Sequence, residues 1–128
     1  MLKSKKKING ILLFDKDVGQ SSNQALQKIK SIFGARKAGH TGTLDVLASG
    51  LLPICFGEST KVSQYLLGAR KTYLTEFRFG LTTSSGDLEG EVLTRGSVDF
   101  LSKEMISGAL SKFVGPLEQV PPMYSALK

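Results

Sequence analysis

The sequence predicts an α+β fold that forms one domain or a part of one. Segments with the two-residue alternation of strands are interspersed with segments whose apolar residues recur at helical spacing, and at least two strands are expected to pair. The chain has 128 residues, of which 41% are hydrophobic and 22% charged. This composition is sufficient for one compact core.

The first third predicts a strand followed by a helix. Residues Ile8–Phe14 are mostly apolar, and the turn-forming run 15–19 closes the expected strand. A polar residue at 21–23 can then cap a helix, and Gly34 supplies its end. The expected apolar face of this helix consists of Ala25, Leu26, Ile29, Ile32 and Phe33.

The middle of the chain predicts two strands around a helix. Residues Leu51–Phe56 form an apolar run typical of a buried strand, and residues 58–67 favour a helix with Tyr65 in the core. Residues Lys71–Phe79 alternate with a period of two, which makes them the clearest strand of the chain.

The last third predicts a turn, a strand, a helix and an extended end. Residues Gly80–Gly90 are polar and turn-forming, and a short strand is expected near Glu91–Thr94. Ser102 can cap a helix that ends at Gly115-Pro116, and residues Val120–Lys128 are expected to be extended. The expected apolar stripe of this helix is Met105, Ile106, Ala109, Leu110 and Phe113.

The positive charge of the chain is concentrated in its first third. Residues 1–40 contain nine Lys or Arg and two Asp, whereas residues 41–128 contain eight Lys or Arg and nine Asp or Glu. A solvated tail and an ordinary helix face explain such charge equally well. One-sided positive charge also attracts a polyphosphate backbone, so nucleic acid is the first partner to test. The cations concerned are Lys3, Lys5, Lys6, Lys7, Lys28, Lys30, Arg36 and Lys37.

Several function classes are disfavoured by composition. One cysteine, Cys55, lies in an apolar run and is expected to be a core residue, and one histidine, His40, gives no metal-ligand cluster. We therefore expect no metal site. No run approaches the roughly 20 apolar residues of a membrane span, and the start lacks the pattern of a signal peptide. The expected location is the reducing cytoplasm, with no membrane partner.

The most informative segment is residues 39–50, Gly-His-Thr-Gly-Thr-Leu-Asp-Val-Leu-Ala-Ser-Gly. Asp45 is the only charged residue between His40 and Glu58. Most isolated aspartates in glycine-rich loops accept hydrogen bonds from their own turn. The neighbouring histidine, threonines and glycines favour a functional role, in which an apolar setting would require the carboxylate to be stabilised or useful.

The order of motifs resembles the bacterial tRNA pseudouridine-55 synthases, the TruB family. Residues 39–50 are similar to the family's Gly-His-Thr-Gly-Ala-Leu-Asp-Pro-Leu-Ala-Thr-Gly, with departures at Thr43, Val46 and Ser49. The resemblance extends from Ile8 to Lys128 in five blocks. The other four include residues 10–16, residues 52–61, Lys71-Thr72-Tyr73 and residues 121–128.

The resemblance implies a partial pseudouridine synthase fold, with a mixed, mainly antiparallel sheet flanked by helices. It also implies that residues 1–128 are the N-terminal portion of the catalytic domain, without the second half and the C-terminal RNA-binding domain of the family. That second half supplies an arginine that pairs with the catalytic aspartate. The implied partner is the T-arm stem-loop of tRNA, and we expect a monomer that needs no cofactor.

The site residues implied by the resemblance lie in several of these blocks. Asp45 falls on the family's nucleophile, and Tyr73 is the second catalytic candidate, stacking on the target base. The expected substrate-binding residues are His40, Gly42, Lys61, Tyr73 and Asp87, with Lys61 and the basic arm near RNA phosphates. Ser84 stands where the family usually has an aspartate, whereas Asp87 keeps the later acidic position.

The implied chemistry is the isomerisation of uridine to pseudouridine. A carboxylate suits this reaction because it can bond covalently to the sugar or base, or accept a proton from C2′ of the ribose. The sequence leaves both routes open. The alternative function of the chain is a tRNA-binding or RNA-folding module without turnover. A small phosphate-binding domain is disfavoured, because no Gly-x-x-x-x-Gly-Lys or Gly-x-Gly-x-x-Gly motif is present.

Overall fold

Residues 5–118 are described by a computed structural model, in which the chain divides into two units, Met1–Thr72 and Tyr73–Lys128. The expected extended segment Val120–Lys128 lies outside the described residues. Each unit has its own antiparallel sheet and its own helix, so the predicted α+β class is confirmed.

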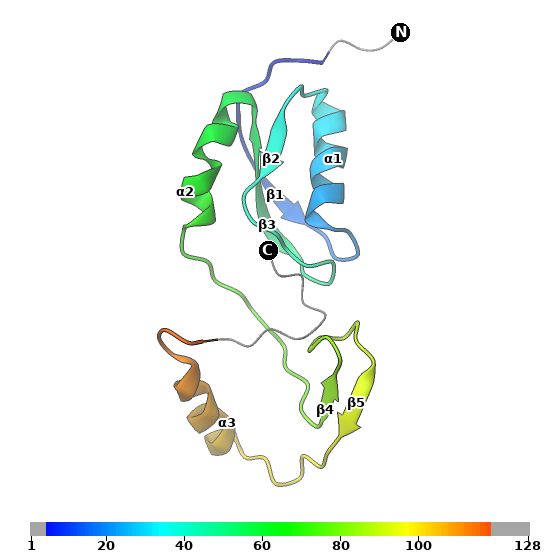
Figure 1. Cartoon of the computed structure of the whole chain (residues 1–128), viewed down its shortest axis with the longest axis vertical. Helices are drawn as coiled ribbons and strands as arrows, with labels where there is room; N and C mark the ends of the chain where they lie inside the picture. Colours follow the sequence, from blue (N-terminus) through cyan, green and yellow to red (C-terminus); the bar gives the residue numbers. More distant parts are fainter. Residues whose placement is uncertain (1–4, 119–128) are drawn as a thin grey trace. The chain divides into compact units, whose positions relative to one another are not determined.

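The first unit contains a three-stranded antiparallel sheet with the order β1-β3-β2 (Figure 1). Strand β1 (Gly10–Lys16) pairs with β3 (Gly50–Phe56) along its whole length, and β2 (Ala38–His40) pairs with the other edge of β3. The expected strands at 8–14 and 51–56 are therefore present. The first is displaced by two residues, because pairing with β3 begins at Gly10 and continues through Lys16.

Helix α1 (Ser22–Phe33) lies beside this sheet and builds the core with it (Figure 1). Ser21 caps the helix, accepting a hydrogen bond from the Gln24 amide while the Gln24 side chain accepts one from Ser21, and Gly34 ends it in the left-handed region at φ 62°. Burial of each large apolar side chain contributes about 1.5–3 kcal/mol. The core cluster is Leu26, Ile29, Ala35, Ile54 and Phe56.

Three expected core residues of the first unit, Ile32, Phe33 and Tyr65, are exposed. Ile32 lies on the predicted apolar face of α1 but is 68% exposed, because the sheet covers only the Ala25, Leu26 and Ile29 side. Tyr65 is 71% exposed. The predicted helix at 58–67 is a 3-10 helix, η1 (Gly57–Val62), followed by the short α2 (Ser63–Leu67), neither of which buries a residue.

The predicted strand at Lys71–Phe79 is wrong, since these residues adopt no regular secondary structure. Alternation defines two faces of an extended segment, but a strand also needs a neighbour for its backbone hydrogen bonds. Within residues 5–118 no strand pairs with this segment, and its large side chains, such as Leu74 and Phe77, are exposed.

The second unit is built from local elements. A bulged hairpin joins β4 (Leu81–Thr83) to β5 (Val92–Arg95), so the expected turn at 80–90 also contains a strand. Ser102 caps α3 (Lys103–Leu110) as predicted, and a 3-10 turn, η2 (Ser111–Phe113), follows. The helix ends before Gly115. No described residue of this unit is buried, so the predicted apolar stripe of α3 is not a core face in residues 73–118.

Candidate active site

The loop that follows β2 carries the candidate nucleophile. It leaves the sheet at His40, which pairs with Ile54, and returns at Gly50 as the start of β3. The Thr41 amide donates a hydrogen bond to the Pro53 carbonyl at 3.1 Å, and the Ala48 amide donates one to the Asp45 carbonyl at 3.1 Å. The sheet therefore fixes the start of the loop, and a tight turn closes it after Asp45.

The residues on both sides of Asp45 are tied to the segment that enters α1. The buried Ser22 hydroxyl accepts a hydrogen bond from the Leu44 amide at 2.8 Å and donates to the Leu44 carbonyl at 3.0 Å. The Gly19 amide donates to the Val46 carbonyl at 2.8 Å. These bonds hold the backbone of Asp45 from both neighbours, a role of Ser22 that its helix-capping position in the sequence did not reveal.

Asp45 itself is exposed to solvent. The expectation that Asp45 lies in an apolar, poorly hydrated setting is therefore wrong, because no other part of residues 5–118 buries it. Within these residues the one ion pair joins Lys61 to Glu58, so Asp45 has no cationic partner there. The loop presents a carboxylate on a fixed backbone, and a bound substrate would have to exclude the water around it.

Two buried polar atoms precede Asp45 on the same loop. His40 Nδ1 and Thr41 Oγ1 have no hydrogen-bond partner among the described residues. An unsatisfied buried polar group costs about 1–3 kcal/mol, and such groups mark places where a ligand or a further segment supplies a partner. His40 was expected at the site from the sequence, whereas Thr41 was not singled out there.

Gly42 allows the loop to turn and lies near a lysine. Its φ of 107° is a conformation that residues with a Cβ rarely adopt. A Cβ built on Gly42 would lie 3.9 Å from Cε of Lys71, whose ammonium donates to the carbonyls of Leu67 and Ala69. Lys71 is the first residue of the Lys71-Thr72-Tyr73 block. Its membership of this block was the only feature of the sequence that associated Lys71 with the loop.

Lys61 lies on η1, one turn after Glu58, with which it forms an exposed ion pair. The hydrogen bond and the charge of Glu58 raise the pKa of Lys61, and Lys61 in turn lowers the pKa of Glu58. Lys61 therefore remains a cation over the whole physiological range. Its present partner is a carboxylate rather than a phosphate.

The remaining expected site residues belong to the second unit. Tyr73 is 65% exposed. Asp87 accepts hydrogen bonds from the Ser85 hydroxyl and the Glu89 amide, and these lower the pKa of its carboxyl. Ser84 pairs with Glu91 across the hairpin through its amide, which donates to the Glu91 carbonyl, and through its hydroxyl, which accepts from the Glu91 amide. His40, Gly42 and Asp45 thus lie along one segment of the first unit, and Tyr73 and Asp87 belong to the second unit.

No metal cluster accompanies these residues. Across residues 5–118 no group of three or more His, Cys, Asp or Glu side chains could hold a metal ion. In the same part of the chain no helix has the length and apolarity needed to cross a membrane. Cys55 is buried and unpaired, as expected, and its burial raises the pKa of the thiol.

The sequence matches one protein family and many curated proteins. Residues 30–128 match the family model of the TruB family pseudouridylate synthase N-terminal domain. The chain is 55% identical over 129 residues to tRNA pseudouridine synthase B of Marinomonas sp. (strain MWYL1), a match that covers 100% of the chain and 42% of the relative. It is 58% identical over 121 residues to the protein of the same name from Chromohalobacter salexigens, covering 94% of the chain and 39% of the relative. The chain thus spans about two fifths of the length of these relatives.

The structure of the chain also resembles solved structures. The chain resembles a protein in the structure of an H/ACA RNP bound to a substrate RNA containing 2′-deoxyuridine, with a TM-score of 0.59 and 29% identity over 86% of this chain and 29% of that one. It also resembles a chain in a Cbf5-Nop10-Gar1 complex, with a TM-score of 0.59 and 27% identity over 93% of this chain and 31% of that one. These similarities support the fold class expected from the motifs.

Proposed function

Because the chain belongs to the TruB family of pseudouridylate synthases, we propose that it takes part in converting a uridine of tRNA to pseudouridine, at position 55 in the T-arm, with Asp45 as the nucleophile. Its residues would form the N-terminal portion of the catalytic domain. We further propose that the protein acts in the cytoplasm as a monomer and needs no cofactor.

The reaction places clear demands on Asp45. The bond from N1 of the base to C1′ of the ribose breaks, the base turns, and a bond from C5 to C1′ replaces it. The hydrogen on C5 leaves as a proton and N1 ends with one, so there is no net oxidation or reduction. Asp45 would bond covalently to the sugar or base, or take a proton from C2′.

The observation that carries the proposal is the double attachment of the loop around Asp45. The Ser22 hydroxyl holds Leu44, and the Gly19 amide holds Val46, so the carboxylate between them extends from a fixed backbone. Such positioning lowers the activation free energy, because the reacting group loses little conformational entropy on reaching the transition state. Its exposure is compatible with the proposal because a target nucleotide, once bound, would cover it.

The other candidates would bind the nucleotide and its neighbours. The target base must leave its stack, which costs a few kcal/mol, and stacking on Tyr73 would offset part of this cost. His40 is partly exposed at the end of β2, directly before the Asp45 loop, from where its ring could contact the nucleotide. Gly42 would let the loop backbone approach the nucleotide, Lys61 would contact a phosphate, and Asp87 would stand on the substrate side of its turn.

The test is tritium release from a T-arm stem-loop RNA that carries 5-tritiated uridine, since C5 loses its hydrogen in the reaction. We expect Asp45→Asn to lower release by about 10³-fold or more, while the affinity for the RNA changes less than twofold. Asp99→Asn, which removes a carboxylate from the second unit, is the matched control and should keep the original rate. Equal release by Asp45→Asn and the unaltered chain would remove Asp45 from the reaction.

A second candidate function is RNA binding without turnover. It is favoured by the exposure of Asp45 and by the lack of a cation beside it in residues 5–118. On this alternative the unaltered chain binds the stem-loop but releases no tritium, and Asp45→Asn has nothing to abolish. The same two measurements, release and affinity, therefore decide between the functions.

A further inference from the structure

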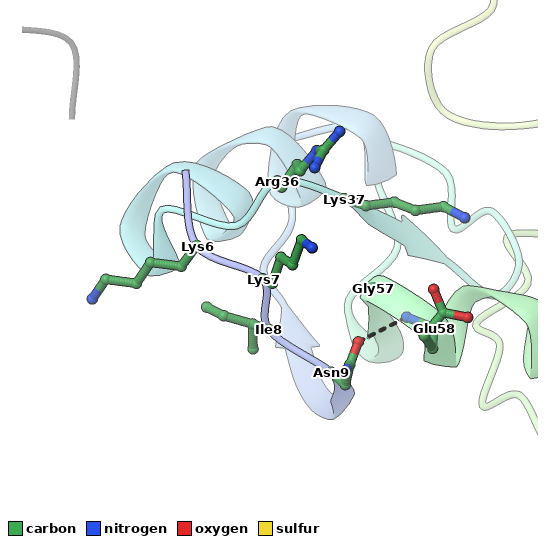
Figure 2. A pocket seen from close by; sticks show the side chains of 8 residues that line it. All are labelled: Lys6, Lys7, Ile8, Asn9, Arg36, Lys37, Gly57 and Glu58. Atoms are coloured by element: carbon green, nitrogen blue, oxygen red, sulfur yellow. Dashed lines mark hydrogen bonds between the residues drawn. The ribbon is translucent and has the colours of Figure 1, made fainter. Parts of the chain in front are cut away.

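A pocket of about 350 Å³ lies outside residues 39–50, and four of its lining residues are basic (Figure 2). Lys6 and Lys7 come from the N-terminal arm, Arg36 and Lys37 from the connection between α1 and β2, and Glu58 from the start of η1. Four basic residues and one acidic residue thus line the pocket. Cations gathered without matching acids repel one another, so their grouping favours an anionic ligand.

The backbone beneath the cations is fixed by hydrogen bonds. The Lys6 amide donates to the Gly34 carbonyl at 2.7 Å, and the Arg36 amide donates back to the Lys6 carbonyl at 2.9 Å. Lys6 and Ala35 therefore form a parallel bridge, which docks the arm against the end of α1. The basic arm is not a solvated tail at these residues, because its position relative to Arg36 is set by the main chain.

The opposite wall is fixed in the same way. The Gly57 amide donates to the Lys37 carbonyl at 3.0 Å, and the Asn9 side-chain oxygen accepts from the Glu58 amide at 2.9 Å. Gly57 has a φ of 56°, and a Cβ on it would clash with the Asn9 side chain and the Ile8 carbonyl. Only glycine allows these segments to approach so closely.

The basic side chains of the pocket are accessible to a ligand. Lys7, Arg36 and Lys37 are exposed, and in Figure 2 the Lys7 side chain extends toward the segment that carries Arg36 and Lys37, whereas that of Lys6 extends away. Glu58 is the one acid here. It forms an ion pair with Lys61, and its pKa is lowered first by Lys61 and to a lesser extent by the charge of Lys37.

We infer that this pocket binds the phosphodiester backbone of RNA, with Lys7, Arg36 and Lys37 as the phosphate contacts and Glu58 as a carboxylate that competes with the phosphates for Lys37 and Lys61. The inference rests on the proposed function, since it takes tRNA as the RNA. It adds a contact region outside the 39–50 loop. Exposed, long cationic side chains suit an extended polyanion, whose binding releases counterions, better than a small phosphate compound, which requires enclosure.

The first test is the salt dependence of binding, measured by fluorescence anisotropy of a labelled T-arm stem-loop between 50 and 200 mM KCl. Each phosphate contact adds about 0.9 to the slope of log affinity against log salt on a duplex. We expect Lys7→Ala, Arg36→Ala and Lys37→Ala each to reduce the slope by about that amount and to weaken binding about 3- to 10-fold at 50 mM. Lys103→Ala, which removes an exposed lysine from α3 in the second unit, should leave the slope unchanged.

The second test is a gain of affinity. Glu58→Gln keeps the shape of the side chain and its amide contact with Asn9 but removes the competing charge, so we expect binding to tighten about two- to fivefold at 50 mM salt. Disruption of the local structure could not produce this gain. A loss of affinity in Glu58→Gln, or a fall in slope in Lys103→Ala equal to that in the pocket variants, would overturn the assignment.

The outcome separates this inference from the proposed function. Neither measurement needs turnover, so a chain that releases no tritium can still show the slope changes. Conversely, Asp45→Asn should keep the original slope. The alternative ligand is a small phosphate compound, for which inorganic phosphate serves as the probe in nuclear magnetic resonance titrations. If inorganic phosphate saturates the pocket at micromolar concentration while the pocket variants bind RNA normally, the pocket binds such a compound instead of RNA.

Discussion

The two units of the chain form their secondary structure in different ways. In the first, β1 and β3 pair across the intervening residues 17–49, and α1 buries Leu26 and Ile29 against them. In the second, the hairpin and the capped helix α3 are made by contacts close in sequence, and no described residue is buried. Caps and turns are thus sufficient to shape elements, but only long-range pairing produced a core here.

This contrast also divides the candidate site. The loop that carries His40, Gly42 and Asp45 is attached to β3 and to the start of α1, so its position depends on the packed unit. Asp87 is held by its own turn through Ser85 and Glu89. Substitutions in the core should therefore disturb the Asp45 loop, whereas those in the turn should act only locally.

The largest effect is expected from removing core volume. Ile54 is fully buried in the cluster beneath α1, so Ile54→Ala should lower the free energy of unfolding by about 2–5 kcal/mol in urea denaturation followed by circular dichroism. Leu88→Ala is the matched control, because Leu88 is 77% exposed in the second unit and should cost less than about 0.5 kcal/mol. Equal costs at the two positions would mean that the second unit has a core too.

The next effect tests the attachment of the loop. Ser22→Ala removes two part-buried hydrogen bonds, to the Leu44 amide and to its carbonyl, and at about 0.5–1.5 kcal/mol each their loss should cost about 1–3 kcal/mol. Hydrogen exchange of the Leu44 amide should accelerate, while that of amides in β3 should follow only the change in overall stability. Ser31→Ala, on an exposed position of the same helix, is the control. An unchanged Leu44 exchange rate would show that the Ser22 hydroxyl does not hold the loop.

A smaller effect compares the two serine caps. Ser21→Ala breaks a reciprocal capping box at the start of a packed helix and should lower the free energy of unfolding by about 1 kcal/mol. Ser102→Ala removes the hydrogen bond to the Met105 amide from a helix with no buried residue. It should accelerate exchange of that amide without shifting the urea midpoint. A shift of the midpoint by Ser102→Ala as large as that by Ser21→Ala would contradict the difference between the units.

The sequence predicted what local chemistry determines. The cap at 21–23, the stop at Gly34, the buried strand at 51–56 and the Ser102 cap all follow from the residues themselves, and the structure has them. The strand at 71–79 and the burial of Tyr65 depended on neighbours that residues 5–118 do not provide, and these predictions failed. The tie from Ser22 to Leu44, 22 residues away, arises only on folding, so no local pattern indicated it. The sequence did indicate Lys7 and Arg36 as candidate nucleic-acid contacts, but their place in one pocket with Glu58 came only from the structure.

The smallest effect concerns the turn that holds Asp87. Hydrogen bonds from Ser85 and then Glu89 lower the pKa of the Asp87 carboxyl, so the stabilisation they give the turn is present above the ordinary pKa of an aspartate and is lost as the pH falls through the lowered value. Ser85→Ala should move the pKa of Asp87 upward in a carbon-detected magnetic resonance titration, whereas Ser84→Ala, which removes a hydroxyl bonded to Glu91 instead, should not. Because the carboxyl is exposed, urea denaturation of the first unit should be the same in both variants. If protonation of Asp87 instead lowered the free energy of unfolding of the first unit, the turn would not be an independent local structure. The contrast between the two units would then be contradicted.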